Sequence, residues 1–139
     1  MKENNQLSES LEDYLEIILE LQTTKTVARS KDIADKMDIK RGSVTGMLKK
    51  LADNHLIDYE PYGYVTLTPE GKKIAQEIER RHIFLKDFFH RVLGVDEETA
   101  ERTGCQVEHA MDKETFKKFR EFIAKVDACP NCKTGPYKM

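Results

Sequence analysis

The sequence predicts a mainly α-helical protein in which three short helices and a β-hairpin precede three further helices. Two observations lead to this prediction. Apolar residues recur with the 3.6-residue period of an α-helix through most of the chain, and the period changes to two only between residues 56 and 68. Residues that cap or end helices stand at the borders of the periodic segments.

The first three helices are predicted between residues 8 and 54. Ser10 is expected to cap a helix over residues 8–22. The polar turn TTKT separates it from a short second helix after Ser30, and the third helix runs over residues 43–54. Each helix has one apolar side, and the third presents hydroxyl and ammonium groups elsewhere on its surface.

The change of period predicts a β-hairpin, LIDYE and YVTLT, that turns at Pro61-Tyr62-Gly63. Three short helices followed by a hairpin are typical of a winged helix-turn-helix, whose third helix enters the DNA major groove while the hairpin contacts the flanking backbone. Ser43 and Thr45 are suited to base edges, and Lys49 and Lys50 to phosphates. A solvated helical face with no DNA partner is the alternative.

Cap residues divide the rest of the chain into three helices. Thr68 and Pro69 supply the cap and the first residue of a long helix that ends at Gly94. Asp96 opens the fifth helix and Asp112 the sixth, which has an apolar stripe of phenylalanines. The last stretch, CPNCKTGPYKM, shows no periodicity.

Composition limits the class of protein. The chain has 139 residues, 35% of them charged, and a net charge of −2, which suits one compact unit or two small ones. Acids dominate residues 1–22, whereas Lys40, Arg41, Lys49 and Lys50 meet no acid between residues 39 and 52, so a local basic face is available to a polyanion. No apolar run approaches the roughly 18 residues of a membrane span and the amino end lacks a signal core, so we expect a cytoplasmic protein with no membrane partner.

The fifth helix has a set of metal-ligand side chains on one face. Cys105, Glu108 and His109 stand at positions i, i+3 and i+4. Thiolate and imidazole suit iron or zinc, and carboxylate suits manganese or iron. Taken singly, the three also fit a small core residue, a solvated acid and a satisfied polar residue, and the same holds for Asp13 and Glu16 in the first helix and His82 in the fourth.

Six segments together identify a family resemblance. They are SLEDYLEIILEL, RSKDIADKMDIKRGSVTGMLKKL, YVTLTPEGKKIA, RRHIFLKDFF, LGV and CQVEH. In order and spacing the chain resembles, over residues 7–127, the diphtheria-toxin-repressor-like (DtxR/MntR) metalloregulators in their short two-domain form. The resemblance implies a winged helix-turn-helix DNA-binding domain over residues 1–72, a helical metal-binding and dimerisation domain over residues 73–127, and a tail over residues 128–139.

The resemblance also implies a metal site, which gathers ligands from helices one, four and five. The implied ligands are Asp13, Glu16, His82, Cys105, Glu108 and His109. Five of them match the binuclear site of the manganese branch, whereas Cys105 matches the iron branch, so Fe²⁺ or Mn²⁺ is the expected cofactor. The iron branch builds an ancillary site with an acid at the position of Lys86 and a histidine at that of Glu101, and that site is broken here.

For DNA, the resemblance adds Ser30 and Lys31 to the expected contacts and implies a homodimer on a pseudo-palindromic double-stranded operator. Metal binding would favour the arrangement in which both reading heads match the half-sites, and such proteins repress metal-uptake genes when the metal is plentiful. Gly46 departs from the pattern, because it offers no side chain where some members read a base. No enzyme activity and no organic substrate are expected.

The pair Cys129 and Cys132 leaves other interpretations open. Its CxxC spacing fits a thiol redox protein, half of a Cys₄ zinc site completed by a second subunit, or a reduced tail without a site. Redox CxxC motifs normally start a helix in a βαβ unit, and no strands are predicted around this one. A winged-helix regulator that is not controlled by metal is a further alternative.

Overall fold

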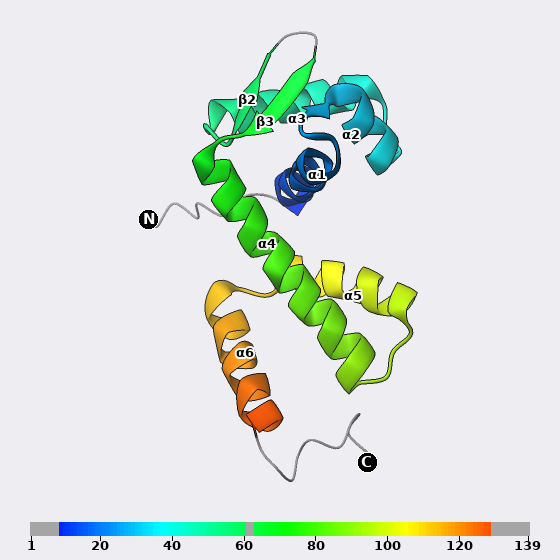
Figure 1. Cartoon of the computed structure of the whole chain (residues 1–139), viewed down its shortest axis with the longest axis vertical. Coiled ribbons are helices and arrows are strands. Elements are labelled where there is room, and N and C mark those ends of the chain that lie inside the picture. Colours follow the sequence, from blue (N-terminus) through cyan, green and yellow to red (C-terminus); the bar gives the residue numbers. More distant parts are fainter. Residues whose placement is uncertain (1–8, 61–62, 129–139) are drawn as a thin grey trace. The chain divides into compact units, whose positions relative to one another are not determined.

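The structure is a computed structural model that describes residues 9–60 and 63–128 (Figure 1). The expected turn residues Pro61 and Tyr62 and the cysteines Cys129 and Cys132 lie outside the described residues. The chain divides into two compact units between Glu79 and Arg80, within a helix and seven residues after the expected boundary at 72. Among the described residues, no helix is both long enough and apolar enough to cross a membrane.

The first unit contains the three short helices and a small sheet. Its elements are α1 (Glu9–Lys25), β1 (Ala28–Arg29), α2 (Ser30–Met37), α3 (Arg41–Asp53), β2 (Ile57–Tyr59), β3 (Tyr64–Leu67) and the first half of α4 (Pro69–Asp87). The strands form an antiparallel sheet in the order β1-β3-β2, with Val65 paired to Ala28 on one side and to Tyr59 on the other. The winged helix-turn-helix is therefore confirmed, with β1 as an unpredicted third strand.

Helix α1 differs from its prediction in its cap residue and at its carboxyl end. Ser10 was expected to cap the helix but lies inside it, so that prediction was wrong. The expected turn residues Thr23 and Thr24 are also helical, and their hydroxyl groups donate to the carbonyl oxygens of Leu19 and Glu20 one turn earlier. The helix ends where Thr26 takes a left-handed conformation with φ of 72°.

The core of the first unit joins the apolar sides of its helices and the inner face of its sheet. Its fully buried side chains include Leu15, Ile18, Ile33, Leu48 and Val65. Gly71, in the first turn of α4, packs against the backbone of Leu56, since a Cβ at this position would lie 1.8 Å from the Leu56 carbonyl oxygen. Thr68 caps α4 as expected, and its Oγ1 accepts from the Gly71 N–H at 3.1 Å.

The second unit consists of the end of α4, a π-helical turn η1 (Phe88–Val92), α5 (Glu97–Ala110) and α6 (Lys113–Ala128). Gly94 has φ of 73° and ends the run that begins in α4. Asp96 and Asp112 cap α5 and α6 by accepting from the N–H groups of Thr99 and Thr115 at 3.0 and 2.6 Å. These hydrogen bonds hold the pKa of both aspartates below the usual value.

Aromatic contacts hold α4 and η1 against α6. Phe84 makes edge-to-face contacts with Phe116 and Phe119, and Phe88 makes one with Phe119 at 4.8 Å between ring centroids. Helices α4 and α5 also pack closely: a Cβ added at Gly104 of α5 would lie 3.2 Å from the backbone nitrogen of Lys86 in α4. The absence of a side chain at Gly104 therefore sets the close spacing of α4 and α5.

Candidate metal centre and nucleic-acid interface

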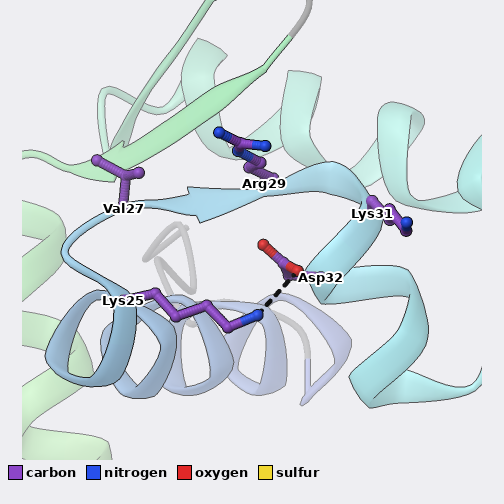
Figure 2. Close-up of a pocket in the computed structure, with 5 residues that line it drawn as sticks. All are labelled: Lys25, Val27, Arg29, Lys31 and Asp32. Carbon is purple, nitrogen blue, oxygen red and sulfur yellow. Dashed lines mark hydrogen bonds and ion pairs between the residues drawn. The ribbon is translucent and has the colours of Figure 1, made fainter.

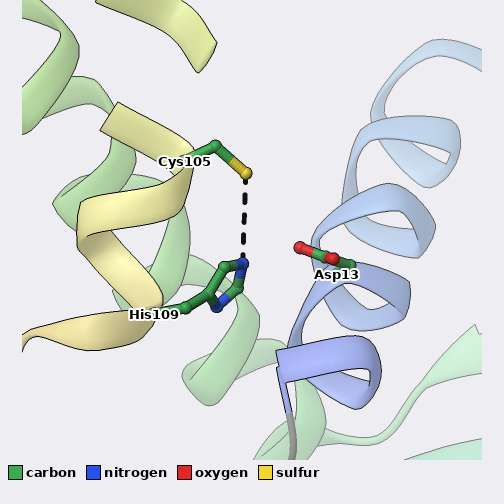
Figure 3. Close-up of side chains that lie close together, drawn as sticks. All are labelled: Asp13, Cys105 and His109. Carbon is green, nitrogen blue, oxygen red and sulfur yellow. Dashed lines mark hydrogen bonds between the residues drawn. The ribbon is translucent and has the colours of Figure 1, made fainter. Parts of the chain in front are cut away.

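Three of the predicted ligands lie on one face of α5. Cys105 Sγ and His109 Nε2 are 4.0 Å apart, one helical turn from each other (Figure 3). Both side chains are half-buried, and Glu108 beside them is fully buried with 1% exposure. The predicted spacing of i, i+3 and i+4 thus produces a thiol, an imidazole and a carboxylate on adjoining positions.

Glu108 is chemically the most unusual residue of this group. Both carboxylate oxygens are buried and accept no hydrogen bond from the described residues. Burying a carboxylate without compensation is costly, and a cation bound to these oxygens would offset the cost. His82 of α4 lies beside this carboxylate, with Nδ1 3.2 Å from Glu108 Oε2 in an arrangement that does not meet hydrogen-bond geometry.

His82 stands between two carboxylates. Its Nε2 lies 2.7 Å from Glu101 Oε1, on the side of the ring away from Glu108. The His82 side chain is only 12% exposed, so the protein and not the solvent orients the ring. This pattern, an imidazole between a buried and an outer carboxylate, is typical of metal-binding histidines.

Lys86 forms ion pairs with Glu101 and Glu97 on α5. Its Nζ lies 2.9 Å from Glu101 Oε2 and 3.5 Å from Glu97 Oε1. The hydrogen bond from Lys86, with a smaller one from His82, holds the pKa of Glu101 below its usual value, and Glu101 in turn raises the pKa of Lys86. The position that holds an acid in the iron branch is thus occupied by an ammonium group in an ion pair.

The two remaining predicted ligands are in the other unit, on α1. Asp13, drawn in Figure 3, and Glu16 are half-buried one turn apart. Glu12, between the apolar residues of α1, is a buried acid with 9% exposure. Of the six predicted ligands, two therefore lie on α1 in the first unit and four lie on α4 and α5 in the second unit.

The donor set of the second unit fits a divalent transition metal. It combines a hard donor, the buried carboxylate that accepts no hydrogen bond from the described residues, with two imidazoles as borderline donors and a thiol as a soft donor. Iron accepts all three kinds of donor, whereas manganese favours the carboxylate.

The predicted DNA contacts all lie in the first unit. Ser30 and Lys31 begin α2, and Lys40 precedes α3. On α3, Arg41, Ser43, Lys49 and Lys50 are exposed, while Val44, Leu48 and Leu51 face the core. Thr45 is half-buried and its hydroxyl donates to the Arg41 carbonyl oxygen at 3.2 Å, which leaves its oxygen lone pairs for a base edge.

Arg29 adds a basic side chain directly before Ser30 and Lys31, and it contacts Tyr64 of the hairpin. The Arg29 guanidinium lies 5.3 Å from the centroid of the Tyr64 ring, and Tyr64 is 49% exposed on β3. Arg29 also lines a pocket of about 310 Å³ with Lys25, Val27, Lys31 and Asp32 (Figure 2). Lys25 is paired to Asp32 at 3.2 Å there, so Arg29 and Lys31 are its remaining cations.

From the sequence alone, Glu101 is recognised only as a departure from the ancillary site, and Glu12, Arg29 and Tyr64 are not singled out. A signal for Glu101 was available, because it precedes Cys105 by four residues and Glu108 by seven and so shares their face of α5. Arg29 and Tyr64 are 35 residues apart and meet only through the sheet, so no local pattern could pair them.

Comparisons with known proteins agree with this arrangement. Residues 6–65 match the family "Iron dependent repressor, N-terminal DNA binding domain", and residues 68–137 match "Iron dependent repressor, metal binding and dimerisation domain". A helix-turn-helix transcriptional regulator of Methanocaldococcus jannaschii is 37% identical over 120 residues, which cover 86% of this chain and 96% of that protein. The transcriptional regulator MntR of Escherichia coli is 39% identical, with 84% of this chain and 75% of that protein covered.

Among solved structures, the manganese regulator SloR aligns with a TM-score of 0.71 and 26% identity. The match covers 82% of this chain but 53% of the SloR chain, so this chain spans about half the length of that structure. The matches to both family domains and the identity to full-length relatives lead to one conclusion. The chain belongs to the iron-dependent repressor (DtxR/MntR) family of metal-dependent, DNA-binding transcriptional regulators.

Proposed function

We propose that this protein is a cytoplasmic, homodimeric repressor of metal-uptake genes that binds a pseudo-palindromic operator when Fe²⁺ or Mn²⁺ is bound. The proposed ligands are Asp13, Glu16, His82, Cys105, Glu108 and His109. The family match supports metal and DNA as ligands, and the family name and the SloR relative point to iron and manganese.

The observation that supports the metal site best is the buried Glu108 carboxylate. Neither of its oxygens accepts a hydrogen bond from the described residues. His82 Nδ1 lies 3.2 Å from Glu108 Oε2, and the other ring nitrogen of His82 contacts Glu101. A divalent cation supplies the positive charge that this carboxylate lacks. Glutamate is rarely buried to this depth unless it is paired or binds a metal ion.

Regulation follows from where the ligands originate. Two of the proposed ligands belong to α1 of the DNA-binding unit, and four belong to α4 and α5 of the other unit. A metal that uses both sets stabilises the arrangement in which they meet, and it shifts the population only by its preference for that arrangement. A preference of about 10⁴-fold changes a protein from mostly inactive to mostly active.

The test combines metal binding and DNA binding. Isothermal titration with Mn²⁺, and with Fe²⁺ under anaerobic conditions, is compared for the native chain, Glu108→Gln and the control Glu98→Gln, an exposed acid of the same helix. A duplex enriched from a random-sequence library in the presence of Mn²⁺ serves as the DNA, and fluorescence anisotropy measures its binding.

We expect the native chain and Glu98→Gln to bind metal and to bind the duplex more tightly in its presence, and Glu108→Gln to lose both properties. DNA binding that is equally tight with metal and with chelator would identify a regulator that metal does not control. Metal binding by Glu108→Gln with native affinity would remove Glu108 from the ligand set.

A further inference from the structure

A ladder of charged side chains joins α4 and α5 outside the proposed ligands. His82 and Lys86 are one turn apart on α4, and Glu97 and Glu101 are one turn apart on α5. The contacts run in sequence from Glu108 to His82, from His82 to Glu101, and from Glu101 through Lys86 to Glu97. Glu101 thus touches His82 directly but stays about half exposed, with 51% of its side chain accessible.

The two nitrogens of His82 face different surroundings. Nε2 is 2.7 Å from Glu101, a distance that requires a proton on Nε2, because a carboxylate oxygen can only accept. A neutral imidazole has one N–H, so the other nitrogen, Nδ1, then presents a lone pair. Nδ1 lies 3.2 Å from the buried Glu108 oxygen in an arrangement that does not meet hydrogen-bond geometry, so a metal ion bound to Glu108 is within reach of this nitrogen.

We propose that Glu101 is a positioning residue of the metal centre, which holds the proton of His82 on Nε2 and so makes Nδ1 the metal-binding atom. This inference rests on the proposed function, since it assigns a role to a residue outside the ligand set. Carboxylates that accept from the second nitrogen of a ligating histidine orient the ring and increase its basicity.

Lys86 keeps Glu101 in this position. Its ammonium binds the Glu101 oxygen that does not face His82, so each carboxylate oxygen has one donor. The short path between the helices is possible because Gly104 brings α5 against the α4 backbone at Lys86. Because Lys86 occupies one oxygen of Glu101 and His82 the other, this carboxylate orients the histidine and does not itself bind a metal ion.

The alternative is that Glu101 acts only as a negative charge near the metal. Substitutions separate the two ideas, because glutamine keeps an acceptor oxygen but not the charge. A positioning role predicts that Glu101→Gln largely retains metal affinity and that Glu101→Ala loses it, whereas a charge effect predicts equal losses for both. Glu98→Ala, which removes an exposed acid from the same helix, is the matched control.

The experiment measures Mn²⁺ affinity by isothermal titration and identifies the coordinating nitrogen by long-range ¹H–¹⁵N NMR of the Zn²⁺-loaded, ¹⁵N-histidine-labelled chain. In the native chain we expect Zn²⁺ on His82 Nδ1 and a proton on Nε2. We expect Glu101→Ala to weaken Mn²⁺ binding about 10-fold or more and to mix the two coordination modes. Glu101→Gln should stay within about threefold of the native chain, and Glu98→Ala should not change it.

Three results would overturn the proposal: Zn²⁺ on Nε2 in the native chain, native affinity in Glu101→Ala, or equal losses in Glu101→Gln and Glu101→Ala. Failure of the proposed function looks different, because the native chain and Glu108→Gln would then bind Mn²⁺ equally poorly. Circular dichroism melting of each variant shows whether a loss reflects unfolding.

Discussion

Cys105 is the residue at which the metal-ligand set departs from an all-oxygen-and-nitrogen site. The Cys105 side chain is half-buried and its sulfur lies 4.0 Å from His109 Nε2, so both atoms are close enough to bind the same metal ion. The other proposed ligands of α4 and α5 are one carboxylate and two imidazoles, which serve iron and manganese alike. The balance between the two metals should therefore depend on this one atom.

Replacing Cys105 by Glu tests this dependence. Thiolate favours Fe²⁺ over Mn²⁺, so Cys105→Glu should shift the ratio of the two activation midpoints toward Mn²⁺, by an amount of the order of tenfold, or about 1.4 kcal/mol. The midpoints are measured as metal-dependent DNA binding under anaerobic conditions. His109→Ala, as a control, should abolish activation by both metals, and an unchanged ratio in Cys105→Glu would mean that the sulfur only packs beside the site.

Lys50 is the residue-scale test of the DNA interface. It is exposed on α3, the helix expected in the major groove. Lys50→Ala should weaken binding to all sequences and flatten the slope of log affinity against log salt by about one unit, because one phosphate contact is lost. Lys117→Ala on α6, also an exposed lysine, should leave the slope unchanged. A native slope in Lys50→Ala would show that Lys50 does not neutralise a phosphate.

At the scale of single elements, two glycines in helices of the first unit have opposite surroundings. Gly46 is exposed in the middle of α3, and a Cβ there would meet nothing within 4 Å. Gly71 is buried in the first turn of α4, where a Cβ would overlap the Leu56 carbonyl oxygen. The first glycine costs the helix stability without a packing reason, whereas the second permits the contact of α4 with the segment before β2.

The same substitution should therefore have opposite effects at these positions. Gly46→Ala should raise the free energy of unfolding by about 0.5–1 kcal/mol, because alanine restricts the unfolded chain and favours helix. Gly71→Ala should lower it by about 1–3 kcal/mol through overpacking. Urea unfolding followed by circular dichroism measures both. Destabilisation by Gly46→Ala would indicate a contact that the fold does not explain.

At the scale of the whole molecule, assembly depends on the apolar residues that the fold leaves exposed. From the sequence alone, the stretch of Phe84, Leu85, Phe88 and Phe89, together with the fifth helix, fits either a homodimer interface or an intramolecular core. Leu85 is buried, and Phe84 and Phe88 pack against α6, as expected for an intramolecular core. In the described part of the second unit, the large apolar side chains that remain exposed are Ile83, Leu93 and Phe122, with 56%, 48% and 55% exposure. These three are the better candidates for the surface that a family dimerisation domain presents.

Phe122→Glu tests the dimer directly. A buried phenylalanine at a subunit interface contributes several kcal/mol, so a charged replacement should turn the dimer into monomers in sedimentation velocity at micromolar concentration. Lys117→Glu, an exposed charge change on the same helix, should remain dimeric. A dimeric Phe122→Glu with a native circular dichroism spectrum would place the interface elsewhere.

The sequence by itself determined the features that depend on neighbours along the chain. Thr68, Asp96 and Asp112 cap their helices as predicted, because a cap forms between residues three positions apart. The faces of α3 and α5 also follow from periodicity, so Lys49 and Lys50, or Cys105 and Glu108, could be placed without a structure.

Only the tertiary structure decided what depends on distant residues. The two-residue strand β1 exists because β3 pairs with it, and it is too short to show a period. Glu101 reaches His82 only because Gly104 lets α5 pack against α4, and Phe84 and Phe88 find aromatic partners on α6. Such contacts join residues that are 18 or more positions apart, and their geometry depends on helix packing that no local pattern encodes.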